Sequence, residues 1–150
     1  MHLHTVHGTA VSAQKSGLLP INQFAITMGN DVGYHDYDGP GLLPDERVSL
    51  IKNMSLPNKN FRKMLFLRNH GTLTWGRSIE EAFILMHYLE RSCRIQVAAQ
   101  SSNGELVFPE ADIIKRTASI GQGTGNINWS KIGFDALLRC LNEKDLTYQN

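Results

Sequence analysis

The sequence predicts an α/β domain, because short strand-type runs alternate with segments of helical periodicity along its 150 residues. The run 63–67, Lys-Met-Leu-Phe-Leu, is apolar after its first residue, which is typical of a buried strand. The segment from Ile79 to about Ala99 repeats apolar residues at helical spacing. A chain of this length, 41% hydrophobic and 19% charged, is long enough to bury one core. We therefore expect residues 1–150 to form a single domain.

Further elements are expected on either side of these two. Strand-type residues occupy 1–4, 32–37 and 72–75. Helices are expected at 9–15, at 22–28, from Pro44 to a stop at 55–58, at 109–116 and at 129–142. In the last helix the expected apolar contacts are Ile132, Leu137, Leu138 and Leu141. Residues 38–41 indicate a turn, and the glycines of 121–126 indicate a connector, because they lack the Gly-Lys-Ser/Thr ending of a phosphate loop.

The long helix has a clear start signal. Ser78 is expected to be its N-cap, and Glu81, three residues later, completes a capping-box pattern. Glu80 and Glu81 could be read as a catalytic pair, but capping and the helix dipole explain both, and we favour that interpretation. The apolar stripe expected on this helix consists of Ala82, Phe83, Met86, Leu89, Cys93 and Val97.

Charge and cysteine content exclude several classes of protein. The net charge is +1 and the basic residues are scattered, so nucleic-acid and anionic-membrane binding are not expected. No apolar run approaches the roughly 20 residues of a membrane span. Cys93 and Cys140 stand alone, without C-x-x-C spacing, and we expect both to be buried thiols in a reducing compartment, the cytoplasm.

Three histidines form a candidate metal site. Side chains two apart on a strand share a face, so His2 and His4 can point at one ion while Leu3 enters the core. His70 lies where an apolar strand ends, next to Gly71. Three nitrogen ligands with an open position are typical of a catalytic rather than a structural zinc. The H-x-H spacing is also common in ordinary strands, so the spacing by itself leaves both interpretations open.

The other histidines are interpreted differently. His7 is out of phase with the first pair, although a bend at Gly8 could bring it near. His35 is expected to be a hydrogen-bonding residue at a strand end. His87 falls on the polar flank of the long helix, where an exposed side chain is expected.

Several motifs occur in an order that resembles one family. They are residues 1–5 (Met-His-Leu-His-Thr), 8–14, 17–20 (Gly-Leu-Leu-Pro), 34–39 (Tyr-His-Asp-Tyr-Asp-Gly), 67–71 (Leu-Arg-Asn-His-Gly) and 134–139. Together they resemble the class II aldolase/adducin family, and the adducin-like branch in particular.

The resemblance implies both a fold and a chemistry. It implies a three-layer α/β/α domain with a mainly antiparallel central sheet. It also implies a divalent metal, usually zinc, held by His2, His4 and His70. In the aldolases of the family the metal is a Lewis acid in carbon–carbon bond cleavage of small phosphorylated sugars or aldehydes. Members usually form cyclic tetramers, so a homo-oligomer is expected.

Two departures from the family pattern weaken the expectation of activity. The family's N-terminal part, with its glycine-rich phosphate-binding segment and an acidic proton-transfer residue, has no counterpart before Met1, so we expect a partial, N-terminally truncated domain. Phe24 stands where the aldolases have a proton-donating tyrosine, and neither Tyr34 nor Tyr37 is assigned to that role. We therefore leave open whether this is an enzyme. A zinc-dependent lyase with reduced or lost activity is the first hypothesis, and a non-catalytic adducin-like interaction module or the product of a decaying gene is the alternative.

Overall fold

The computed structural model describes residues 1–39, 44–56, 61–122 and 128–149. Within these residues the centre of the fold is a four-stranded sheet in the order β1-β4-β3-β2. Its strands are β1 (His2–Leu3), β2 (Val32–His35), β3 (Met64–Leu67) and β4 (Gly71–Thr74). All four lie where the sequence predicts strands.

The sheet is mixed, which corrects the expectation of a mainly antiparallel one. β4 pairs antiparallel with both β1 and β3, whereas β2 pairs parallel with β3. The connections explain the difference. A short turn joins β3 to β4 and reverses the chain, but helix α3 (Pro44–Met54) lies between β2 and β3 and returns the chain to the same end of the sheet.

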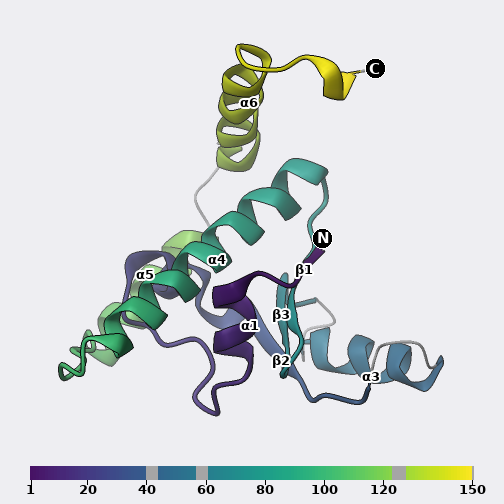
Figure 1. The fold of residues 1–150 in the computed structure, drawn as a ribbon. Coiled ribbons are helices and arrows are strands. Elements are labelled where there is room, and N and C mark those ends of the chain that lie inside the picture. The colour runs from purple at the N-terminus through teal and green to yellow at the C-terminus, as the bar shows by residue number, and fades with distance from the viewer. Residues whose placement is uncertain (40–43, 57–60, 123–127, 150) are drawn as a thin grey trace.

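Helices cover both faces of the sheet. Figure 1 shows α3 on one side and α1, α4 and α5 on the other, which gives three layers. The remaining bounds are α1 (Val6–Ser12), α2 (Gln23–Met28), α4 (Ile79–Ser101), α5 (Ala111–Gln122), α6 (Trp129–Asn142) and two 3-10 turns, η1 (Gly29–Asp31) and η2 (Thr147–Gln149). Among the residues that the structure describes, no helix combines the length and apolar character that a membrane span requires.

The core lies between β3 and the helices α1, α2 and α4. All four residues of β3 are buried, as its continuous apolar run predicts for a strand with a neighbour on each side. The central cluster consists of Val11, Met28, Met64, Phe66, Leu89 and Cys93. The stripe expected on α4 therefore supplies two of the six residues at the centre of the core.

Two helices differ in extent from the prediction. α1 begins at Val6 rather than at residue 9, with Thr5 in an extended conformation as its N-cap. α5 runs to Gln122, well beyond the expected end at residue 116. The turn expected at 38–41 and the connector expected at 121–126 lie largely outside the described residues.

The start of α4 is capped as expected. The Ser78 side chain accepts a hydrogen bond from the Glu81 backbone N–H at 3.3 Å. The Glu81 carboxylate accepts from the Arg77 backbone N–H at 2.8 Å and pairs with Lys63 Nζ at 2.7 Å. Glu81 thus serves the structure of the helix start, but its carboxylate accepts from the Arg77 N–H and not from the Ser78 N–H that a complete capping box would use.

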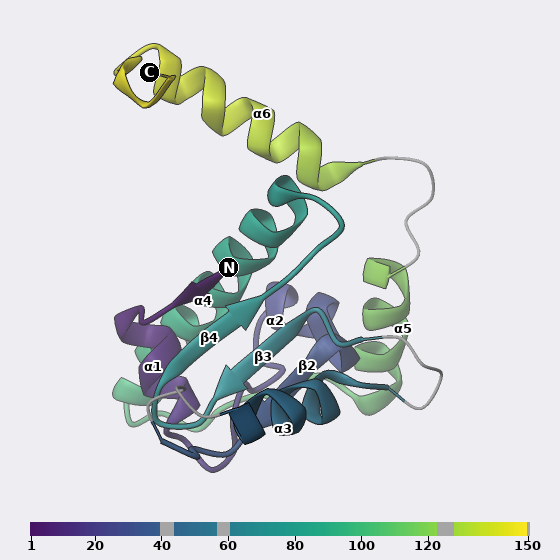
Figure 2. The same cartoon turned by 90° about the vertical axis from the view of Figure 1, so that its right-hand side faces the viewer.

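The contacts expected for α6 are largely wrong. α6 extends away from the layered body and meets the first turns of α4 (Figure 2), where Phe134 packs against Phe83 at 5.3 Å between ring centroids. Its side chains Ile132, Leu137 and Leu141 are 54%, 44% and 40% exposed. Cys140 is exposed as well, which corrects the expectation that both cysteines are buried; Cys93 is buried as expected.

Candidate metal site

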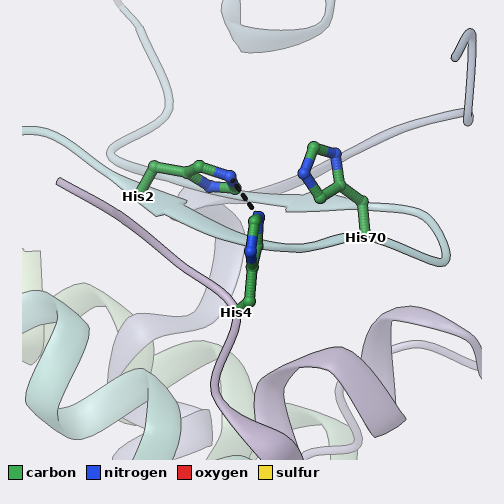
Figure 3. A group of neighbouring side chains, drawn as sticks. All are labelled: His2, His4 and His70. Atoms are coloured by element: carbon green, nitrogen blue, oxygen red, sulfur yellow. Dashed lines mark hydrogen bonds between the residues drawn. The ribbon is translucent and has the colours of Figure 1, made fainter. Parts of the chain in front are cut away.

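The three histidines of the candidate metal site come together. One ring nitrogen from each of His2, His4 and His70 lies within 4.8 Å of the other two. Figure 3 shows the three rings converging, two from the N-terminal segment and one from the turn between β3 and β4. The ring centroids are 4.6, 4.7 and 5.0 Å apart. This is a spacing that a single ion can span.

The strand register explains how residues so far apart in the sequence meet. β1 lies beside β4, with His2 opposite Leu73 and Leu3 opposite Thr72. His70 is in the turn that leads into β4, so it comes close to the residue that follows β1. Asn69 adopts a φ of 58°, a left-handed conformation that Asn tolerates better than most residues and that shapes this tight turn.

Gly71 allows the close approach between the turn and His4. A Cβ atom at this position would lie 2.5 Å from the Leu3 carbonyl oxygen and 2.9 Å from His4 Cδ2. Real Cβ atoms do not approach other atoms so closely, so a larger residue would push His4 away from His70. The glycine of the sequence motif is thus required sterically.

One histidine is oriented by a carbonyl group. His2 Nδ1 lies 2.9 Å from the Thr72 carbonyl oxygen. A carbonyl only accepts, so Nδ1 carries the proton and the neutral ring presents a lone pair at Nε2. That Nε2 lies 2.9 Å from His4 Nε2. A backbone carbonyl that holds the second nitrogen of a histidine is a usual companion of metal-binding imidazoles.

The donor set fits a borderline divalent ion. Neutral imidazoles suit Zn²⁺ and its neighbours in the first transition row better than Mg²⁺ or Ca²⁺, which prefer oxygen ligands. His2 and His4 are exposed and His70 is half-buried, so the cluster is open to solvent. Three nitrogens and an open side match the arrangement of catalytic zinc sites.

The two unassigned tyrosines have different surroundings. The Tyr37 ring lies edge-on to His70, with 6.4 Å between centroids, and its side chain is 57% exposed. The Tyr34 hydroxyl instead accepts from the Leu18 backbone N–H at 2.9 Å, and its ring stacks on Phe66. Tyr34 is therefore a packing residue, and Tyr37 is the phenol beside the histidines. Sequence spacing alone does not show which of these two tyrosines lies beside the histidines.

The remaining positions considered for the site lie elsewhere. Phe24 stacks on Tyr88 of α4 at 5.1 Å between centroids. His35 Nδ1 lies 2.9 Å from Asn53 Nδ2, in agreement with the predicted hydrogen-bonding role at a strand end. His7 does not join the cluster; its Nδ1 lies 2.8 Å from Glu90 Oε1. His87 is exposed, as predicted.

A groove of about 800 Å³ runs between the N-terminal segment and α4. Its lining residues are Met1, Leu3, Thr5, His7, Phe83, Met86, His87, Glu90, Arg91, Arg94, Ile95 and Ala98. None of the three clustered histidines is among them, so the groove is distinct from the candidate metal site. Leu3 lines this groove and is 39% exposed, which corrects the expectation that it enters the core. Glu90, which no sequence motif marks, also faces the groove.

Comparison with known proteins identifies the family of the chain. A family profile described as Class II Aldolase and Adducin N-terminal domain matches residues 1–97. Alpha-adducin of Mus musculus is 41% identical over an alignment of 152 residues that covers 94% of this chain and 20% of the adducin.

Solved structures agree with the profile. A crystal structure of an aldolase II superfamily protein from Pseudomonas syringae superposes with a TM-score of 0.90 at 41% identity, over 100% of this chain and 58% of that chain. An L-fuculose 1-phosphate aldolase from Glaciozyma antarctica shares the fold, with a TM-score of 0.73 at 22% identity, over 95% of this chain and 52% of that chain. This chain thus spans a fifth of alpha-adducin and just over half of each of these two solved chains. Because the profile matches more than half of the chain, the chain belongs to the class II aldolase and adducin family.

Proposed function

We propose that this chain binds one divalent metal ion, zinc in the first instance, through His2, His4 and His70. The observation that carries the proposal is the convergence of three imidazoles within 4.8 Å. The donor set and the carbonyl behind His2 support it. We further propose that residues 1–150 form one class II aldolase-type domain around this site, without a further domain boundary.

The chemistry we propose is that of a metal-dependent carbon–carbon lyase. When bound, the ion supplies a Lewis acid that polarises a carbonyl oxygen. The chain itself supplies three neutral ligands, a fixed tautomer at His2 and an accessible phenol at Tyr37, which can hold or donate a proton beside His70. The substrate class we propose is a small phosphorylated sugar or aldehyde, supported by the fold shared with an L-fuculose 1-phosphate aldolase.

We expect the lyase activity of the isolated chain to be low. Within the described residues the ligand cluster contains three histidines and no carboxylate. A positioned proton-transfer group typically contributes about 10²–10⁴-fold in rate. The Tyr37 ring lies 6.4 Å from the His70 ring, centroid to centroid, which makes Tyr37 a proton-transfer candidate beside the cluster.

A second function is favoured by two observations. Alpha-adducin is 41% identical over most of this chain, and α6 exposes an apolar face. These support a non-catalytic interaction module that assembles with copies of itself.

We also propose a reducing compartment, the cytoplasm, because Cys93 and Cys140 are both free thiols.

Metal analysis of untagged protein tests the first proposal. We expect about one equivalent of zinc per chain after exposure to the metal and removal of the excess, and release on acidification because protons compete for the ring nitrogens. The double variant His2→Ala/His70→Ala should lose the metal. His87→Ala is the matched control, because it removes an exposed histidine outside the cluster. A wild-type protein that retains no metal, or a double variant that retains it fully, would contradict the proposal.

Activity is tested separately. Aldol cleavage of a set of phosphorylated sugars should be measured with saturating zinc, and turnover that disappears in His70→Ala would support the lyase. Metal binding without turnover on any sugar would favour the interaction module.

A further inference from the structure

We propose that Glu90 is a positioning residue for the metal site, which it serves by fixing the chain between His4 and helix α1. The inference rests on the proposed function, since it concerns how the ligands are placed. Glu90 belongs to α4 and is separated from this segment by more than 80 positions in the sequence. It lines the groove rather than the histidine cluster, so its effect on the site acts through the backbone.

The Glu90 carboxylate contacts three residues of the N-terminal segment, Thr5, His7 and Gly8. Its Oε2 accepts hydrogen bonds from the Thr5 hydroxyl at 2.5 Å and from the Gly8 backbone N–H at 3.0 Å. Its Oε1 lies 2.8 Å from His7 Nδ1. Thr5 directly follows His4, so this clamp begins one residue after a metal ligand.

The clamp replaces a cap that the helix lacks. Thr5 is the N-cap of α1, yet its side chain makes no capping hydrogen bond to the backbone. Glu90 satisfies one of the free N–H groups of the first turn from another helix, and its negative charge lies at the positive end of the α1 dipole. Hydrogen bonds to an ionised acceptor are about twice as strong as neutral ones.

Gly8 shows how closely the clamp is fitted. A Cβ at Gly8 would lie 2.6 Å from Thr5 Oγ1 and 3.3 Å from Glu90 Oε2. A side chain at Gly8 would therefore require the Thr5 and Glu90 side chains to move, which would disturb the clamp. The positions of Thr5 and α1 relative to α4 are set within narrow limits.

The same helix also reaches the third ligand. Thr9 Oγ1 of α1 donates to the His70 carbonyl oxygen at 3.3 Å. α1 is thus held by Glu90 through His7 and Gly8, and the next residue, Thr9, contacts the His70 backbone. Loss of the clamp would let the start of α1 shift, and with it the position of His4 relative to His70.

Co²⁺ binding, read by absorption spectroscopy and competition with a chelator, tests the proposal. For Glu90→Ala we expect Co²⁺ affinity to fall about 10–100-fold, the usual effect of losing a group that orients a ligand. The absorption bands of bound Co²⁺ should also change in position or intensity. Glu90→Gln keeps an oxygen that can accept from Thr5 and Gly8, so it should restore most of the affinity.

Glu81→Ala is the matched control. It removes a carboxylate from the same helix, together with an ion pair to Lys63 and a bond to the Arg77 backbone. It should lower the melting temperature and leave the affinity and spectrum unchanged.

If Glu90→Ala binds Co²⁺ with the affinity and absorption spectrum of the wild type, the proposal is overturned and Glu90 has only a structural role. If Glu90→Ala does not fold, Thr5→Val removes one clamp contact with little change in shape. Weaker Co²⁺ binding by this variant supports the positioning role, and unchanged binding overturns it. A wild-type chain that binds no Co²⁺ would instead remove the proposed metal site, and this inference with it.

Discussion

Gly71 lies where the turn after β3 meets the Leu3 carbonyl and the ring of His4, and both contacts are too short for a side chain. At the scale of single residues we expect Gly71→Ala to weaken the free energy of metal binding by more than it lowers the free energy of unfolding. The added methyl group would displace His4, a proposed ligand that is exposed at the surface. Isothermal titration with Zn²⁺ and thermal unfolding measure the two effects. Gly104→Ala, at an exposed position, is the control. If Gly71→Ala binds zinc with wild-type affinity, His4 accommodates the added methyl group without a loss of binding free energy, and the prediction is wrong.

The two cysteines should differ sharply in reactivity. Burial, with a contribution from the charge of Glu90, raises the pKa of the Cys93 thiol to about 12. Cys140 is exposed. Because the thiolate is the reactive form, a thiol reagent at neutral pH should label Cys140 in the native protein and both cysteines after denaturation. Mass spectrometry identifies the labelled site, and rapid native labelling of Cys93 would contradict its burial.

The raised pKa of Cys93 also predicts a loss of stability at high pH. The ordinary value is 9.0, so above it the unfolded state releases the proton while the folded state retains it. The contribution to the free energy of unfolding is complete below about pH 9 and is lost as the pH rises toward about 12. Denaturant titrations across this range should show a smaller decline for Cys93→Ala.

At the scale of elements, α4 is the support of the whole arrangement, since it packs on the sheet, carries Glu90 and meets α6. Its start depends on the bond from Glu81 N–H to the Ser78 side chain. We expect Ser78→Ala to lower the free energy of unfolding by about 1 kcal/mol, the usual value for a lost N-cap. Urea titration followed by circular dichroism measures it. Ser119→Ala, an exposed serine in α5, should change it by less than about 0.5 kcal/mol, and equal effects would argue against a specific cap.

At the scale of the whole molecule, the exposed apolar face of α6 predicts self-association. Isolated apolar side chains are common on surfaces, but Leu137 and Leu141 lie four residues apart on one face of the helix and are 44% and 40% exposed. We expect light scattering after size exclusion to give a mass above the 16.8 kDa of one chain. Leu137→Glu should lower that mass. Arg139→Glu changes charge on the same helix without altering an apolar residue, and an equal effect from it would exclude this face.

Local patterns predicted much of the fold, and contacts between distant segments account for what they missed. The strand at 63–67 and the long helix follow from periodicity, and the approach of His70 to His2 follows from the motif order. The parallel pairing of β2 with β3 depends on how the chain crosses over α3. The contacts of Glu90 with Thr5 and Gly8 join residues more than 80 positions apart, and no local pattern records such contacts.

β1 is only two residues long and lies at the edge of the sheet, yet His2 belongs to it and His4 follows it directly. An ion held between these residues and His70 would join the beginning of the chain to the turn before β4, as a cross-link does. Such a link restricts the unfolded chain over the whole interval between positions 4 and 70, and a long closed interval gives a large entropic gain. The metal would then secure the shortest strand of the described sheet, so its removal should loosen the first residues of the chain.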